Sequence, residues 1–135
     1  MAFEVYIALG DSMTIDDYPA SDAERLGLNC RKDIGAAALL YKNDPQLFPD
    51  LEGKDLASVH PKIKFANLAY DDATTEDMLS EEKMKALHQY STAHCLVTLT
   101  IGGNDMLKIF KAIPANNVKA LTSATQEVHT RYLQL

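Results

Sequence analysis

FEVYIALGDS, residues 3–12, is an apolar run that ends in a turn-forming tripeptide. The run lacks clean polar alternation, which is typical of a strand in a parallel sheet that is covered on both faces. Glu4 lies inside the run and no basic segment precedes it, so the pattern indicates a first strand and not a signal peptide. We therefore expect a strand over residues 3–9 in a cytoplasmic protein.

Two further apolar runs, residues 63–68 and 94–101, also end in loops rich in Gly, Asp or Asn. The stretches between the runs, about residues 33–41 and 75–90, have helical composition. This alternation of strand and helix predicts a three-layer α/β domain with right-handed crossovers.

The remaining segments give a loop and a last helix. Pro and Gly residues indicate a loop over residues 45–53. A helix is predicted over residues 116–133, where one mostly apolar stripe recurs at spacings of three and four, formed by Val118, Leu121, Thr125, Val128 and Tyr132. No repeat or linker is visible, so residues 1–135 are predicted to form a single domain.

Composition excludes several classes of protein. The chain has 135 residues, 47% of them hydrophobic, and a formal charge of −6. The acidic balance argues against nucleic acid and anionic membranes as partners. No apolar segment approaches the roughly 20 residues of a membrane span. Cys30 and Cys95 have no C-x-x-C spacing and fit reduced thiols, although one bridge is compatible with the sequence.

Ligands of parallel sheets bind beyond the carboxyl ends of the strands, so the three loops there are the candidate site. The first holds Ser12, the second holds Asn67 and the pair Asp71-Asp72, and the third is Gly102-Gly103-Asn104-Asp105. A serine there can act as a nucleophile, and an Asn amide can donate to an oxyanion. Taken alone, the first loop is better explained as a turn, and the third is explained as well by a Gly-Gly turn with a helix cap. In the second loop a capping pair of Thr74 and Asp77 explains the threonine and the later acids, but not Asn67 or the pair Asp71-Asp72.

Together, Gly10-Asp11-Ser12, residues 67–75 and Gly102-Gly103-Asn104-Asp105 resemble the three leading blocks of the SGNH hydrolases, also called GDSL esterases and lipases. The resemblance implies a flavodoxin-like sheet of order 2-1-3-4-5 and acyl transfer from a small ester or acylated substrate, without a cofactor or metal. Ser12 is then the nucleophile.

The resemblance also implies the remaining roles. The oxyanion would be held by the backbone N–H groups of Ser12 and Asp72 and by the side chain of Asn104. Asn67 and Gly103 are expected as supporting residues. Asp11 and Asp105 are expected to shape their turns.

The sequence departs from the family pattern in two places. Asp72 stands where the family has a glycine, and its carboxylate would repel a forming oxyanion unless it turns to solvent. The family's general base is the His of a D-x-x-H motif. None of the four histidines follows an Asp at that spacing, and each is better explained by surface exposure or packing: His60, His88, His94 and His129.

The missing base leaves three interpretations open: a fragment that lacks the C-terminal strands, a chain completed by a partner subunit, or a shortened homologue of weak activity. In the family's strand order the third strand is interior, so here it would be an exposed edge where a second chain could pair.

Two other functions compete with an ester hydrolase. The missing base favours a non-catalytic binding or assembly module of the same fold. A flavodoxin-like phosphate binder is disfavoured because the first loop has no phosphate-binding glycine pattern. Four carboxylates near the predicted cleft, if they converged, would suit Mg²⁺ or Ca²⁺: Asp11, Asp71, Asp72 and Asp105.

Overall fold

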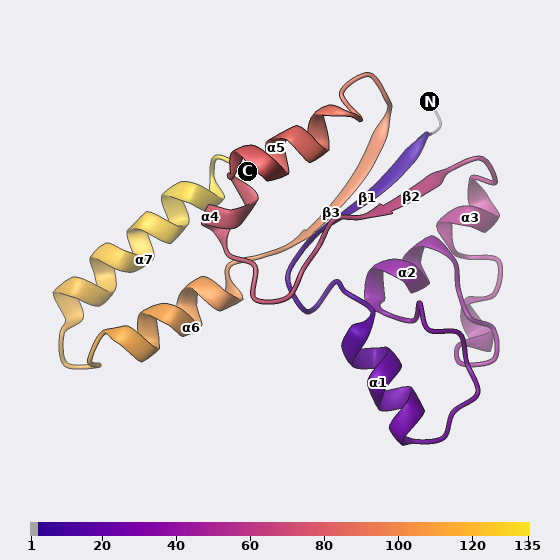
Figure 1. The fold of residues 1–135 in the computed structure, drawn as a ribbon, viewed down its shortest axis with the longest axis horizontal. Helices are drawn as coiled ribbons and strands as arrows, with labels where there is room; N and C mark the ends of the chain where they lie inside the picture. The colour runs from indigo at the N-terminus through magenta and orange to yellow at the C-terminus, as the bar shows by residue number, and fades with distance from the viewer. Residues whose placement is uncertain (1–2) are drawn as a thin grey trace. The chain divides into compact units, whose positions relative to one another are not determined.

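The computed structural model describes residues 3–135 and contains one parallel sheet of order β2-β1-β3 (Figure 1). The strands are β1 (Val5–Gly10), β2 (Lys64–Asn67) and β3 (Cys95–Thr100). Val5 pairs with Lys64 on one side and Cys95 on the other, and the β1 to β3 register continues to Gly10 opposite Thr100. The predicted α/β class is therefore confirmed, and the observed order agrees with the first three strands of the order 2-1-3-4-5 that the resemblance implies.

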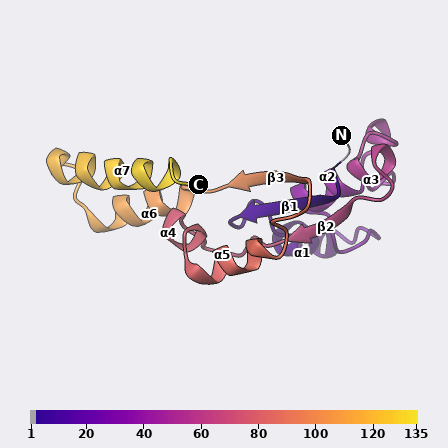
Figure 2. The same ribbon diagram turned by 90° about the horizontal axis from the view of Figure 1, so that it is seen from above.

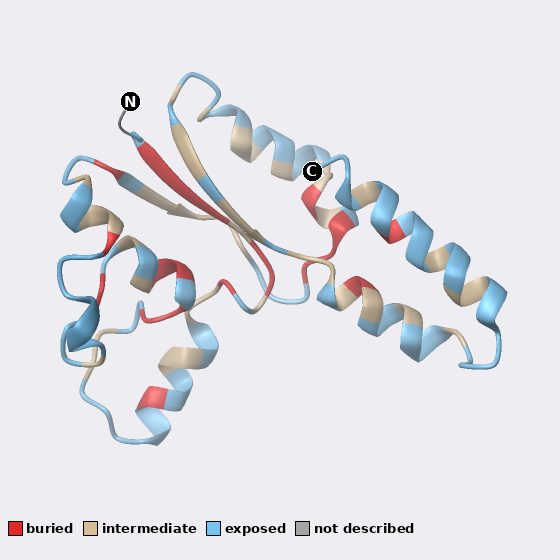
Figure 3. Cartoon of the chain, turned by 180° about the vertical axis from the view of Figure 1, so that it is seen from behind, coloured by how far each residue is buried: buried red, intermediate tan, exposed pale blue. Residues whose placement is uncertain are grey.

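Only the central strand is buried as expected. Ala8, Tyr6 and Ile7 on β1 are 0–2% exposed, and the buried residues of the sheet concentrate there (Figure 3). In contrast, β2 and β3 contain no fully buried residue, and Val97 is 49% exposed. The prediction that all three strands are covered on both faces is wrong for β2 and β3, because they form the two edges of this sheet.

The chain separates into two compact units that are interleaved in sequence. Of the described residues, the first unit contains 3–71 and 92–100, with the whole sheet, and the second contains 72–91 and 101–135. The chain passes between the units at three points, so neither unit is a continuous segment.

The first unit packs short helices against its sheet. These are α1 (Asp17–Arg25), α2 (Ala36–Tyr41), the 3-10 helix η1 (Pro49–Leu51) and α3 (Leu56–Val59). Its core joins Tyr6 and Ala8 to Ala37 of α2, and the Phe65 ring stacks on those of Tyr6 and Tyr41 with centroids 5.1 and 4.9 Å apart. Offset stacking of this kind adds about 1 kcal/mol to the burial energy of the rings.

The second unit is helical and consists of α4 (Thr75–Met78), α5 (Glu81–His88), α6 (Gly103–Ala112) and α7 (Val118–Tyr132). The last two helices lie side by side in both ribbon views (Figure 2). The predicted helix over 116–133 is confirmed, but its apolar stripe is not a core face. Val128 is buried, whereas Val118 and Tyr132 are 67% and 50% exposed.

Other helices differ from prediction. The helix expected over 75–90 is broken, because Ser80 is extended and its hydroxyl accepts from the Lys83 N–H as a second N-cap. The loop expected over 45–53 contains η1. Both α1 and α3 are additional, and the latter begins at an Asp55 cap whose carboxylate accepts from the Ser58 N–H at 2.8 Å.

Two general findings bear on the class of protein. Within residues 3–135, no helix is long and apolar enough to cross a membrane. Cys30 and Cys95 are both free cysteines in the structure.

Candidate active site

Ser12 lies in a tight turn directly after β1. The Thr14 N–H donates to the Asp11 carbonyl at 2.9 Å, and the Met13 N–H donates to the Asp11 carboxylate at 3.1 Å. Asp11 is buried, as is Thr14, whereas Ser12 between them is partly exposed. The buried residues Asp11 and Thr14 fix the turn, and Ser12 remains accessible to solvent.

The turn is fastened to the end of β3 through Thr100. The Thr100 carbonyl accepts from the Asp11 N–H at 3.0 Å, and its hydroxyl bonds the Thr14 hydroxyl and donates to the Asp11 carboxylate at 3.4 Å. The chain approaches so closely that a Cβ on Gly10 would lie 2.3 Å from the Thr100 carbonyl oxygen. Gly10 also has φ +137°, a conformation that L side chains rarely adopt.

Asn67 fastens the same turn to the end of β2. Its Nδ2 donates to the Thr14 carbonyl at 3.3 Å, and its Oδ1 accepts from the Ala69 N–H at 3.1 Å. Thr14 therefore links the carboxyl ends of all three strands, a role that the sequence analysis did not assign to it. A hydroxyl and a carbonyl in a turn give no sequence signal of such long-range contacts.

Asp72, at the position where the resemblance implies a glycine, has φ +59°. Within residues 3–135 it is the only non-glycine residue with a positive φ. Asp tolerates this left-handed conformation better than most residues but still pays steric energy that glycine does not. The backbone here thus has the shape that a glycine would favour.

Asn104 reaches the segment that follows Asp72. Its Nδ2 donates to the Ala73 carbonyl at 3.0 Å. An amide carries two N–H groups, so this bond orients the side chain with a second N–H still available as a donor. Asn104 lies in the first turn of α6, whose N-cap Gly102 has φ +104°, so the first glycine of the Gly-Gly pair supplies the turn. Gly103 is the first residue of the helix.

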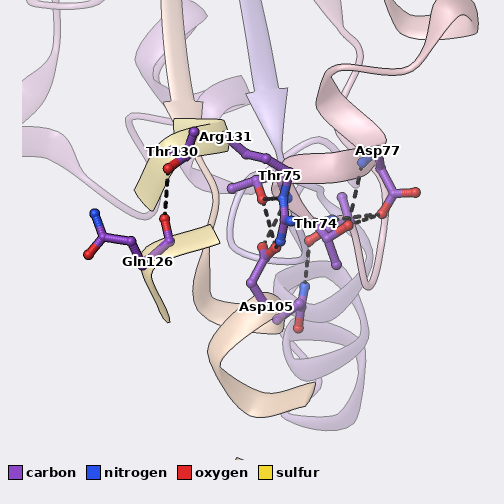
Figure 4. A network of polar contacts seen from close by, with 9 residues as sticks. Thr74, Thr75, Asp77, Asp105, Gln126, Thr130 and Arg131 are labelled. Carbon is purple, nitrogen blue, oxygen red and sulfur yellow. Dashed lines mark hydrogen bonds and ion pairs between the residues drawn. The ribbon is translucent and has the colours of Figure 1, made fainter. Parts of the chain in front are cut away.

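Asp105 does more than shape its own turn. Its buried carboxylate accepts from the backbone N–H of Thr75 at 2.9 Å, from the Thr75 hydroxyl at 2.7 Å, and from Arg131 at 3.2 Å (Figure 4). The expected capping pair of Thr74 and Asp77 is confirmed beside it as a full capping box. The second unit thus brings the Asn104 amide beside the 72–75 segment, while in the first unit Asn67 is joined to the serine turn through the Thr14 carbonyl.

Neither histidine of the first unit lies near Ser12. The carbonyl of His94 accepts from Glu4 and Val5, which places His94 at the start of β1, and His60 packs edge-on against the Phe3 ring. Ser12 follows the other end of β1. Because a strand rises about 3.3 Å per residue, the length of β1 separates Ser12 from both histidines. In the second unit, His88 and His129 are both exposed helical residues.

The alternative metal site gains no support from the carboxylates. Within residues 3–135 no group of three or more His, Cys, Asp or Glu side chains is arranged to hold a metal ion. Asp11 and Asp105 use their oxygens in the bonds described above, and the Asp71 carboxylate accepts from the Tyr18 hydroxyl at 2.8 Å.

The parallel sheet of order 2-1-3, with a Gly-Asp-Ser turn after its central strand, defines the class as an α/β protein with its candidate site at the strands' carboxyl ends. Residues 6–135 match the model of the GDSL-like Lipase/Acylhydrolase family, and the chain belongs to that family. No curated protein matches the chain at a significant level. The resemblance inferred from the three sequence blocks is therefore confirmed.

Proposed function

We propose that the chain is a serine ester hydrolase in which Ser12 attacks the carbonyl of a small ester or acylated substrate. The alkoxide of the tetrahedral intermediate is held by the backbone N–H groups of Ser12 and Asp72 and by the Asn104 side chain. The acyl group passes to Ser12 while the Ser12 proton is transferred to the leaving alcohol; water then attacks the acyl-serine, releases the acid and returns a proton to Ser12.

The observation that carries this proposal is the bond from the Asn104 amide to the Ala73 carbonyl. It supports two of the three donors, because it ties the Asn104 side chain to the residue next to Asp72. The third donor belongs to Ser12 itself, whose turn is fastened by Thr14 and Thr100. Donors fixed before the reaction stabilise the charge that develops in the transition state without a cost of reorganisation.

Hydrolysis of p-nitrophenyl acetate by the full chain tests the proposal. We expect Ser12→Ala to lower kcat by about 10³-fold or more, and a fluorophosphonate to label the wild type but not this variant. Ser21→Ala, which changes an exposed serine on α1, is the matched control and should retain wild-type turnover. Equal turnover in Ser12→Ala and wild type contradicts the proposal.

Asn104→Ala tests the oxyanion hole separately from the nucleophile. Loss of one such donor costs about 10²-fold in kcat, which corresponds to roughly 3 kcal/mol. Labelling of Ser12 should persist at a reduced rate. Asn116→Ala, at an exposed position before α7, serves as its control.

A second candidate is a binding or assembly module without its own general base. The positions of His60 and His94 at the far end of β1 favour it, because neither can take a proton from Ser12 there. This candidate predicts reversible binding of acylated ligands with no turnover. Ser12-dependent turnover by this chain alone excludes it.

A further inference from the structure

Arg131 is a basic residue in the last turn of α7 for which the proposed reaction has no role. Its Nε donates to the Thr75 hydroxyl at 2.8 Å, and its Nη2 contacts the Asp105 carboxylate at 3.2 Å (Figure 4). The Arg131 side chain is 31% exposed and that of Asp105 only 3%. One partner is therefore anchored inside the second unit while the other reaches in from its surface.

The guanidinium fixes the direction of the Thr75 hydroxyl. A hydroxyl has one proton, and Arg can only donate, so the Thr75 proton points to Asp105 at 2.7 Å while its oxygen accepts from Arg131. Arg131 also supplies positive charge to a buried carboxylate, which would otherwise be costly to keep ionised away from water. Each of the three side chains is hydrogen-bonded to the other two, and we call this network the Arg131 clamp: Thr75, Asp105 and Arg131.

The clamp adjoins the proposed oxyanion donors in the chain. Asp105 is the neighbour of Asn104, and Thr75 lies three residues after Asp72. Two consecutive residues of α6 thus hold the segment before and at the start of α4, Asn104 through the Ala73 carbonyl and Asp105 through Thr75. A displaced Asp105 would shift the Asn104 amide relative to the 72–73 backbone.

We propose that Arg131 is a positioning residue, which keeps the donors at Asp72 and Asn104 aligned through the clamp. This inference rests on the function proposed above. Arg131 does not itself contact the reacting atoms. Its effect is specific to the transition state, because the oxyanion forms after the substrate has bound.

The variants Arg131→Gln and Arg131→Lys test the inference in the full chain, with kcat expressed per fluorophosphonate-titrated Ser12. We expect Arg131→Gln to lower kcat by about 10- to 100-fold with KM changed by no more than about twofold. Arg131→Lys should recover part of kcat, because it keeps the charge but not the planar fork of donors. Thr130→Ala removes an exposed bond to the Gln126 carbonyl on the same helix and should retain wild-type kcat.

A merely structural role reduces the amount of titratable enzyme but leaves kcat per titrated serine unchanged, and that result overturns the inference. If Arg131→Gln does not fold, Arg131→Lys decides: a lowered kcat at unchanged KM supports the clamp, and a wild-type kcat overturns it. Wild-type turnover that does not depend on Ser12 is a different failure, that of the proposed function. The wild type, the two Arg131 variants and the Thr130→Ala control are compared by steady-state p-nitrophenyl acetate kinetics after active-site titration.

Discussion

Gly10 passes so close to Thr100 that a Cβ at Gly10 would lie 2.3 Å from both the carbonyl oxygen and the hydroxyl oxygen of Thr100. Because real Cβ atoms do not approach backbone oxygens so closely, the end of β1 accepts only glycine. The same contact brings Asp11 and Thr14 into hydrogen-bonding range of Thr100. The glycine of the Gly-Asp-Ser block is thus a packing requirement of the serine turn.

Gly10→Ala should lower the free energy of unfolding by at least about 3 kcal/mol, because it adds a clash to an unfavourable φ. Urea unfolding followed by circular dichroism measures the loss. Gly27→Ala is the matched control, since Gly27 also has a positive φ, +67°, but no atom within 4 Å of a Cβ. It should cost only about 1–2 kcal/mol. Equal costs for the two variants contradict the packing argument.

The Asp72→Gly variant should have a free energy of unfolding about 1–2 kcal/mol higher than that of Asp72→Ala. Both variants lose the carboxylate, so they differ mainly in how well residue 72 tolerates φ +59°. The comparison is Asp72→Gly against Asp72→Ala by chemical denaturation. At Asp22, in the middle of α1, the order should reverse, with alanine ahead by about 1 kcal/mol. The same order at both positions is incompatible with a left-handed Asp72.

Asp55 should make the free energy of unfolding decrease at acidic pH. Burial by itself raises the pKa of Asp55, but hydrogen bonds from Ser58 and Asn43 outweigh it and leave the pKa below its ordinary value. Its contribution is therefore present above about pH 4, the ordinary Asp value, and is lost as the pH falls through the lowered pKa. Unfolding free energies between pH 2 and 6 should fall less in Asp55→Asn, which keeps an N-cap acceptor but does not titrate.

Tyr6 should make the free energy of unfolding decrease at alkaline pH. Burial raises the pKa of Tyr6, and its hydrogen bond to the Thr98 hydroxyl, at 2.9 Å, offsets only part of this rise. The unfolded chain then releases the proton near pH 10 while the folded chain retains it, so stability is lost from about pH 10 up to the raised pKa. Tyr6→Phe should be less stable at pH 7 by about 1 kcal/mol, the value of the lost hydrogen bond. The gap should narrow above pH 10, and a constant gap contradicts the assignment.

The sequence predicts the strands well because their signals are local. Three apolar runs with Gly, Asp or Asn after them place β1, β2 and β3 within two residues of their observed bounds. The break at Ser80 is also local, and the Ser80-Glu81-Glu82 sequence is a capping signal that an otherwise helical composition obscured.

The candidate site was predictable only in part. Ser12, Asn67 and Asn104 are found by their places at or after the carboxyl ends of strands, and their roles in catalysis or in support of it stay predictions. The partners that hold them are invisible in the sequence, since Thr14 meets Thr100 across 86 residues and Thr75 meets Arg131 across 56. The exposure of Val118 and Tyr132 on α7 was not predictable either, because periodicity shows which face of a helix is apolar but not whether another element covers it.

The fastening of the serine turn by Thr100 sets an order of events during synthesis. Thr14 leaves the ribosome long before the strand that carries Thr100, so the turn has its local bonds and, later, its bond to Asn67, but lacks the bonds to Thr100 until residue 100 has emerged. A nascent chain stopped at residue 71 would carry β1, β2 and Ser12 but none of the bonds from Thr100. Premature termination in that window should release a polypeptide that contains Ser12 but lacks the bonds from Thr100 that hold its turn to β3.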